Sequence, residues 1–215
     1  RQVEFPVIRG SENEVAVDIS KLRAQSEGLI TIDSGFANTG SCQSGVTFLD
    51  GEKGILRYRG YAIEDLAEQS TFLEVAYLLI HGEVPTQDQF NGFREEIATH
   101  TLIHEDLRRF YEAYPSKAHP MGILASMVSA MSTFYPNSHD PNRPAEKVNL
   151  TIVRLLAKLP TVAAWAYKNS VGHPLIYPKN SLHYIQNFLN MMFALPTGDY
   201  ELNPVVVEAL DKLLI

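Results

Sequence analysis

Residues 41–70, SCQSGVTFLDGEKGILRYRGYAIEDLAEQS, mark the point where the chain changes from strand-like to helical patterning. Residues 46–49 and 55–59 read as two strands. The DGEKG sequence between them predicts a hairpin turn, because Asp-Gly supplies the positive φ angles that such a turn requires. Gly60 then ends the second strand, and residues 62–67 open the first helix. We therefore predict a scaffold junction, in which a hairpin joins a small β region to a helical domain.

The composition of the 215 residues is that of an ordinary globular protein, with 45% hydrophobic and 20% charged residues. A formal net charge of −7 argues against a general nucleic-acid binder, which would carry a basic stripe. The single cysteine, Cys42, excludes an internal disulfide framework and fits a reducing compartment. No uninterrupted apolar run approaches the roughly 18 residues of a membrane span, and no signal segment is recognisable. We expect a cytoplasmic protein with no membrane or nucleic-acid partner.

The pattern divides the chain into a small β-rich region, residues 1–59, and a helical domain, residues 60–215. Residues 2–8 and 14–19 read as short strands on either side of a turn, with partial alternation of Val, Phe and Ile. Residues 29–33, LITID, read as a further strand. The helical domain is expected to be the larger part, so the predicted fold class is mainly α.

Helical spacing of apolar residues begins after the hairpin and continues to the end of the chain. Ser70 or Thr71 is a candidate N-cap, Gly82 a candidate C-cap, and Pro160 is expected to kink a long helix. The predicted helices cover residues 72–81, a segment after Pro85-Thr86, and residues 104–114, 121–135, 146–169, 182–194 and 205–215. The last of these stops on Leu213-Leu214-Ile215 without a cap, so we expect the chain to be cut there.

One predicted helix, residues 121–135 (MGILASMVSAMSTFY), carries no charge. A helix that is apolar on every side must be covered on every side, and its repeated Ala and Ser residues would let a partner backbone approach closely. Two interpretations stay open. The helix is either buried in the core of one chain or forms the subunit interface of a homodimer, whose core resembles a domain core cut in half.

Histidine motifs give little support for a metal site. His100 and His104 are four residues apart, which can place two ligands on one helix face, but Thr101 stands where a zincin has its glutamate. A third ligand is not identifiable, so we predict no metal and expect solvated or capping histidines. His119, directly before a proline, is expected to start the uncharged helix.

The remaining polar candidates do not identify a reaction either. Arg154 and Lys158 lie four residues apart and form a two-cation face that can hold a phosphate; the alternative is a solvated face with an ion-pair partner. His173 and Tyr177 are candidates to line a cleft. Cys42 lacks the context of a nucleophile. The residues alone therefore indicate an oligomeric helical protein and leave its chemistry open.

Several longer motifs resemble one family. They resemble the N-terminal half of bacterial citrate synthases of the longer, hexamer-forming type (type II). The resemblance covers essentially the whole chain in order. The motifs are SGFANTGSCQSGVTFLDGEKGILRYRGYAIEDLAEQSTFLEVAYLLIHGEVPT, THTLIHED, AHPMGILASMVSAM, RLLAKLPTVAAWAYK, YPKNSLHYIQNFLNMMF and NPVVVEALDKLLI.

The resemblance implies the large-domain helices of that family preceded by a small β region. It also implies an acyltransferase of the tricarboxylic acid cycle, which condenses acetyl-CoA with oxaloacetate and water to give citrate and CoA. The family uses those two substrates without a further cofactor and forms homodimers or hexamers. Its catalytic histidines and aspartate match no position up to Ile215, so we expect no catalytic residue here and an inactive fragment. A 2-methylcitrate synthase fragment and a non-catalytic regulatory or interaction protein of the same fold remain as alternatives.

The resemblance also places an allosteric region in this half, since some Gram-negative members bind NADH there as an inhibitor. The residues that match that site are His100, Tyr135, Arg154, Lys158 and Asn180. Thr99 stands where those members have an arginine, which removes a bidentate phosphate partner. Further departures occur at Leu102, Leu195 and Thr197, where those members have methionine, threonine and cysteine. We therefore expect weak or absent NADH inhibition.

Overall fold

The computed structural model describes residues 2–198 and 200–215, and the chain divides into two compact units, Arg1–Gly45 and Val46–Ile215. This boundary lies ahead of the hairpin, whereas the sequence placed the division between residues 59 and 60. The physical reason is that the hairpin packs with the helices, because Tyr58 lies against the buried side chains of Leu66 and Leu78. The hairpin therefore belongs to the helical unit.

The first unit contains little regular structure. Strands β1 (Val7–Arg9) and β2 (Val15–Val17) pair antiparallel, with Val7 opposite Val17, and α1 (Leu22–Gln25) is a single helical turn. The strand predicted at residues 29–33 is wrong. Asp33 instead accepts hydrogen bonds from the Asn38 backbone N–H and the Thr39 hydroxyl at 2.8 Å each, which holds a turn. None of the described residues of this unit is buried.

The second unit begins with a three-stranded antiparallel sheet formed by β3 (Thr47–Asp50), β4 (Ile55–Tyr58) and β5 (Tyr61–Ala62). The predicted hairpin is confirmed, but the positive φ angle falls on Gly54 (67°) and not on the Asp50-Gly51 pair. Asp50 holds the turn from its other side, since its carboxylate accepts from the Lys53 backbone N–H at 3.0 Å and pairs with the Lys53 ammonium at 2.9 Å.

Three short helices follow, and the caps predicted for the second of them are confirmed. They are α2 (Ile63–Gln69), α3 (Phe72–His81) and α4 (Gln87–Thr99). Thr71 and Glu74 form a reciprocal capping box, and Gly82 ends α3 with a φ of 92°. Local sequence therefore fixes where α3 starts and stops.

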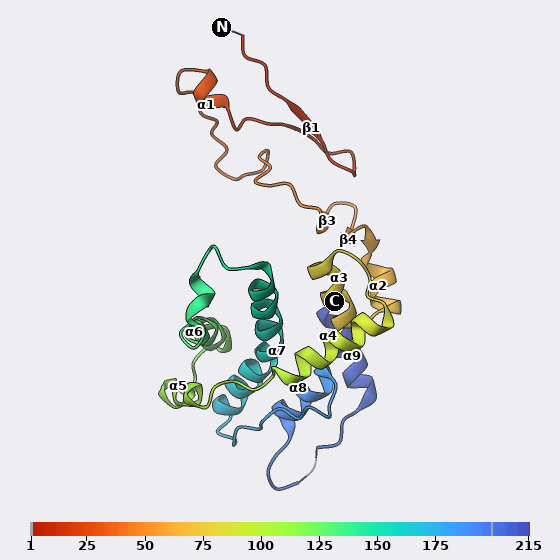
Figure 1. Ribbon diagram of the computed structural model, residues 1–215, viewed down its shortest axis with the longest axis vertical. Coiled ribbons are helices and arrows are strands. Elements are labelled where there is room, and N and C mark those ends of the chain that lie inside the picture. Colours follow the sequence, from red (N-terminus) through yellow and green to blue (C-terminus); the bar gives the residue numbers. More distant parts are fainter. Residues whose placement is uncertain (1, 199) are drawn as a thin grey trace. The chain divides into compact units, whose positions relative to one another are not determined.

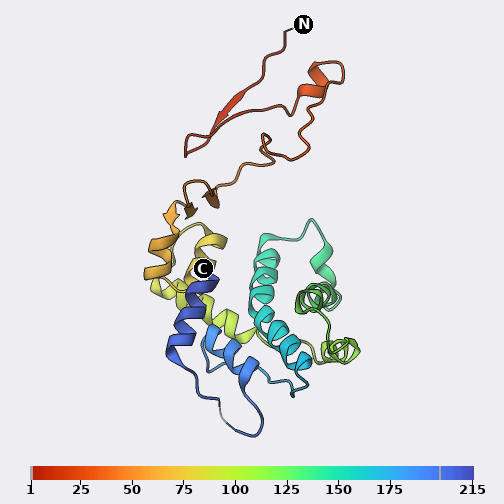
Figure 2. The same cartoon turned by 180° about the vertical axis from the view of Figure 1, so that it is seen from behind.

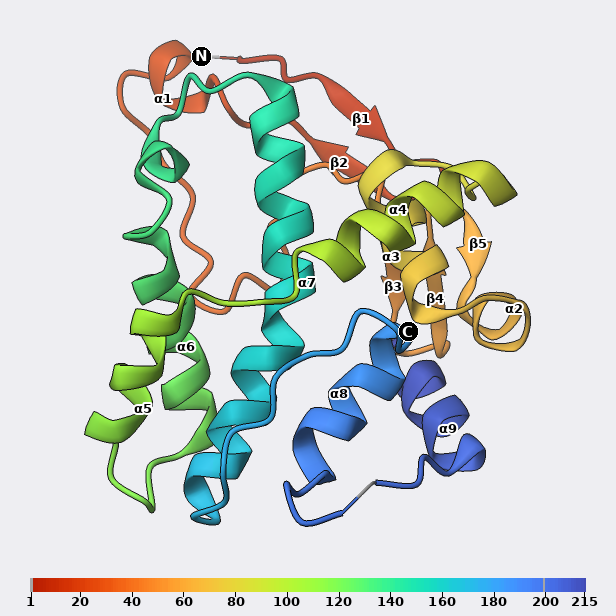
Figure 3. The ribbon, with the colours of Figure 1, turned by 60° about the horizontal axis from the view of Figure 1, so that its bottom comes forward.

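The rest of the unit is also helical. It comprises η1 (Glu105–Leu107), α5 (Arg108–Ala113), α6 (Pro120–Ser132), η2 (Pro136–His139), α7 (Ala145–Ser170), α8 (Tyr184–Phe193) and α9 (Pro204–Leu214). Figures 1 and 3 show α7 with α5 and α6 on one side and α8 and α9 on the other. The end of α9 returns to α2 and α3 (Figure 2), where Ile215 packs on Leu66 and Leu78.

Helix α7 is the central element of the core. One cluster joins Trp165 and Val162 to Tyr111 and Met127, and a second joins Val153 and Ala157 to α3 and α4. By length and composition alone α7 could cross a membrane. Its Val162 and Trp165 side chains, however, are fully buried by the chain itself, as in the core helix of a folded domain.

Pro160 lies inside α7, and the helix runs through it from Ala145 to Ser170. A proline has no N–H, so the carbonyl oxygen of Leu156, four residues earlier, loses its helical donor. The hydroxyl of Tyr184 on α8 donates to that oxygen at 2.9 Å. Burial raises the pKa of the Tyr184 phenol, which keeps its proton available for this bond. A side chain of another helix therefore supplies the donor that the proline lacks.

Tyr184→Phe is predicted to lower the free energy of unfolding by about 1–2 kcal/mol, because it leaves the Leu156 carbonyl without a donor. Combined with Pro160→Ala, which restores the backbone N–H, the same change should cost less. Urea denaturation of the four members of this double-mutant cycle measures the coupling. Strictly additive effects would show that Tyr184 and Pro160 act independently.

Candidate functional site

Four of the five residues proposed from the sequence gather around the middle of α7. The Lys158 ammonium donates to the carbonyl oxygen of His100 at 2.7 Å and to that of Leu102. One turn earlier, the Arg154 guanidinium lies 5.0 Å from the ring centre of Tyr135, which follows α6. The site thus joins the C-terminal end of α4, the end of α6 and α7.

Lys158 connects α7 to the segment after α4 through hydrogen bonds. The carbonyl groups at the end of a helix lack intrahelical donors and carry partial negative charge, which favours a cation there. The neighbouring Thr161 hydroxyl donates to the Thr101 carbonyl oxygen at 2.9 Å. Three successive carbonyl groups, of residues 100–102, are thus held by α7.

The expectation of a solvated face is wrong for Lys158, because this side chain is only 6% exposed. Its ammonium meets carbonyl oxygens, and no ion pair with a carboxylate is found for it among the described residues. Burial, together with the positive charge of Arg154, lowers the pKa of Lys158 to about 8. Sequence spacing placed the two cations on one helix face correctly but could not show that the face is covered.

Asn180 lies apart from the other four residues. It lines a cavity of about 370 Å³ between α4, α7 and α8, together with polar residues such as Arg94, Glu95 and Asn187. Thr101 lines the same cavity, so the segment held by Lys158 forms part of its wall. The cavity is therefore adjacent to the Lys158 contacts, although no hydrogen bond is found between Asn180 and those residues in the described chain.

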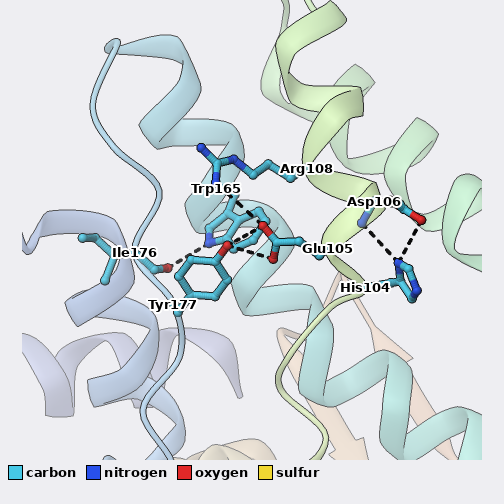
Figure 4. A network of polar contacts seen from close by, with 7 residues as sticks. All are labelled: His104, Glu105, Asp106, Arg108, Trp165, Ile176 and Tyr177. Carbon is cyan, nitrogen blue, oxygen red and sulfur yellow. Dashed lines mark hydrogen bonds and ion pairs between the residues drawn. The ribbon is translucent and has the colours of Figure 1, made fainter.

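A second polar network holds the extended segment between α7 and α8 (Figure 4). The Tyr177 hydroxyl lies 2.7 and 2.8 Å from the two carboxylate oxygens of Glu105, and Arg108 approaches the same carboxylate at 3.7 Å. The indole N–H of Trp165 donates to the Ile176 carbonyl at 2.8 Å. The hydrogen bond to Glu105 raises the pKa of Tyr177. The sequence made Tyr177 a candidate to line a cleft. In the structure its hydroxyl binds Glu105 and so connects this segment to η1.

Four of the histidines lie at or next to helix ends. Ring nitrogens of His104 and His119 accept hydrogen bonds from the Asp106 and Met121 backbone N–H groups at 3.1 and 3.2 Å, so the expected helix-starting role of His119 is confirmed. The His100 ring lies 2.8 Å from the Glu96 carbonyl oxygen. His173 has an exposed side chain, and its backbone N–H donates to the Lys168 carbonyl at the end of α7.

Within residues 2–198 and 200–215, no group of three or more His, Cys, Asp or Glu side chains is placed to hold a metal ion. Cys42 lies exposed in the first unit.

Lys168 is a buried cation that sequence reasoning missed. It is fully buried on α7, and its ammonium donates to the Ala194 carbonyl oxygen, at the end of α8, at 2.6 Å. Burial lowers its pKa. The signal available in the sequence was a lysine on the apolar face of a long helix. Lys158 and Lys168 thus use the same contact at the ends of two different helices.

Residues 35–215 match the family model described as "Citrate synthase, C-terminal domain". The chain belongs to the citrate synthase family. It is 48% identical over 214 residues to citrate synthase 1 of Mycobacterium tuberculosis, in both strains CDC 1551 / Oshkosh and H37Rv. The match covers all of this chain and 49% of that citrate synthase, so the chain spans about half the length of the curated relatives it matches. The resemblance seen in the sequence is confirmed.

Solved citrate synthases share the fold. The structure from Pyrobaculum aerophilum has a TM-score of 0.71 at 26% identity. The match covers 99% of this chain and 50% of the Pyrobaculum chain. That from Thermotoga maritima MSB8 has a TM-score of 0.69 at 28% identity, covering 85% and 45%. A Thermoplasma acidophilum citrate synthase, in ternary complex with carboxymethyl coenzyme A and oxaloacetate, has a TM-score of 0.75 at 21% identity, covering 85% and 46%. The predicted mainly α fold class is confirmed.

Lys158→Met is predicted to remove a pH dependence from the stability of this chain. Between the folded pKa of about 8 and the unfolded value of 10.5, the unfolded chain holds a proton that the folded chain has released. The free energy of unfolding of the wild type therefore rises with pH in this window relative to the variant, by on the order of 2 kcal/mol from pH 8 to 10.

Urea denaturation at pH 7, 8, 9 and 10 measures the difference between wild type and variant. The exposed Lys147 on the same helix, changed to Met, is the matched control. A difference for Lys158→Met that stays constant with pH would contradict the prediction.

Proposed function

We propose that this chain is part of a citrate synthase that condenses acetyl-CoA with oxaloacetate and water to give citrate and CoA. The observation that supports the proposal is 48% identity along the whole chain to citrate synthase 1 of M. tuberculosis. Within this enzyme, an acyltransferase of the tricarboxylic acid cycle, the 215 residues would supply scaffold and subunit-contact surfaces. We further propose a cytoplasmic location and no cofactor besides the two substrates.

We assign no catalytic residue to this chain. His104 and His119 use a ring nitrogen to cap helices. The hydroxyl of Tyr177 and the carboxylate of Glu105 bind each other. General acid–base catalysis requires groups that can reach the reacting atoms, and we place those groups in the part of the family fold that the chain does not span.

We also propose that the enzyme is a homo-oligomer, a homodimer or hexamer, that uses α6 as a contact. One side of α6 packs into the core through Ile123, Met127 and Met131. The other side leaves the small residues Ala125 and Ser129 exposed, so a second helix could approach closely there. The core and interface interpretations of this helix are therefore compatible, one for each side.

Thiol release from acetyl-CoA in the presence of oxaloacetate tests the reaction. We expect turnover from the gene product that contains this sequence together with the other half of the family fold, and none from the 215 residues alone. Turnover by the 215 residues would place catalytic groups within them. Preference for propionyl-CoA over acetyl-CoA would favour the 2-methylcitrate alternative, and inactivity of the whole gene product would favour a non-catalytic role.

NADH is proposed to have a weak effect or none. Thr99 offers no guanidinium for a phosphate, and the Lys158 ammonium is already hydrogen bonded to two carbonyl groups, which it would have to leave. Initial rates of the whole gene product over a range of NADH concentrations are expected to show no saturable inhibition. Saturable inhibition that Arg154→Met relieves would contradict this proposal and would support a nucleotide site at Arg154.

A further inference from the structure

The helix α9 is joined to the start of α3 by one polar contact. A carboxylate oxygen of Asp211 accepts a hydrogen bond from the Phe72 backbone N–H at 3.1 Å. Within residues 2–198 and 200–215, no other hydrogen bond links α9 to another helix, since its remaining bonds lie within α9 and its Asn203 cap. The apolar contacts of Ile215 with the cluster under α2 and α3 complete the attachment.

Two carboxylates therefore meet at the start of α3. As part of the capping box, Glu74 accepts hydrogen bonds from the backbone N–H and the hydroxyl of Thr71 at 2.7 Å each. Asp211 accepts from the next N–H along the chain. The N-terminal end of a helix carries partial positive charge that favours an anion, but Glu74 already supplies one. Asp211 adds a second negative charge from 139 residues away.

The charge of Asp211 has no cationic partner among the described residues. Lys212, next to it on α9, is paired with Glu208 at 3.2 Å. Helix α8 carries no charged residue, and the face of α7 that meets the end of α9 is apolar. Glu74 is the charged group that acts on Asp211. No hydrogen bond or ion pair joins Asp211 to the other titratable side chains of the surrounding elements, namely Tyr58, Arg59, His81, Tyr184 and the three carboxylates of α2.

Protonation of Asp211 changes the balance of forces at this contact. A neutral carboxylic acid keeps a carbonyl oxygen that can accept the Phe72 N–H, so the hydrogen bond is retained. The repulsion from Glu74 and the cost of burying a charge are both removed. Burial of the half-buried Asp211, with a further contribution from Glu74, raises the pKa of its carboxyl even though the hydrogen bond from Phe72 acts in the opposite direction.

We propose that Asp211 makes the attachment of α9 to α3 sensitive to protons, so that α9 is held more firmly when Asp211 is neutral and more loosely when it is ionised. The folded chain then binds this proton more tightly than a chain in which α9 has separated from α3. The stability that protonation adds is full below the ordinary pKa of 3.8 and is lost as the pH rises through the higher pKa of the folded state. The inference does not depend on the proposed reaction.

Hydrogen exchange of the Phe72 amide, followed by NMR between pH 4 and 7.5, tests this contact. Phe72 is the first residue of α3, so its N–H has no acceptor within the helix and its protection factor reports on Asp211. Asp211→Asn keeps an oxygen acceptor without the charge. At pH 7.5 this variant should therefore be more protected than wild type, and the difference should shrink toward pH 4. Asp211→Ala removes the acceptor and should be less protected than Asp211→Asn by about two- to tenfold, the equivalent of one net hydrogen bond.

Glu208→Gln is the matched control, because it removes an exposed carboxylate one turn earlier on α9 and should leave the wild-type pH dependence unchanged. Glu74→Gln retains a residue suited to the capping box and should reduce that dependence. Circular dichroism establishes that each variant is folded, and Glu74→Gln carries the test if Asp211→Asn is not. A difference between wild type and Asp211→Asn that stays constant from pH 4 to 7.5 would overturn the inference. So would better protection of wild type than of Asp211→Asn at pH 7.5, or a pH dependence that Glu74→Gln leaves unchanged.

Discussion

Buried backbone carbonyl groups around α7 must find donors, and side chains supply them. Lys158 and Thr161 of α7 donate to the carbonyl groups of residues 100–102, and Lys168 donates to that of Ala194. An unsatisfied buried carbonyl costs about 1–3 kcal/mol, so each contact has a strong reason to persist. These bonds attach the segments after α4 and α8 to α7. Helices α4 and α8, which border the cavity near Asn180, are therefore positioned by their contacts with α7.

The same constraint operates in the reverse direction, where neighbouring elements supply donors to α7. Tyr184 donates to the Leu156 carbonyl that Pro160 leaves without a partner, and Tyr111 donates to the Val162 carbonyl at 2.9 Å. A proline inside a helix otherwise leaves the carbonyl group four residues earlier without a donor. Both tyrosines come from helices packed on α7, so these two contacts exist only in the tertiary structure.

The hydrogen bonds of Lys158 affect how the nucleotide site implied by the family resemblance could bind a phosphate. An ammonium held by two carbonyl groups in a buried position is a poor starting point for a phosphate contact, since binding would expose both carbonyl groups. Arg154 is placed differently, because its guanidinium lies over an aromatic ring at the end of α6. Any ligand at this place would therefore meet Arg154 more readily than Lys158.

The sequence by itself determined the family, the mainly α class and the local boundaries of elements. Thr71, Gly82 and His119 mark helix ends through contacts within a few residues, so their roles are readable from the chain. Only the tertiary structure decided what the polar residues do. The burial of Lys158 and the pairing of Tyr184 with the Leu156 carbonyl depend on segments 56 to 58 and 28 residues away. Helical spacing shows which side chains share a face, but whether another element covers that face depends on contacts distant in sequence.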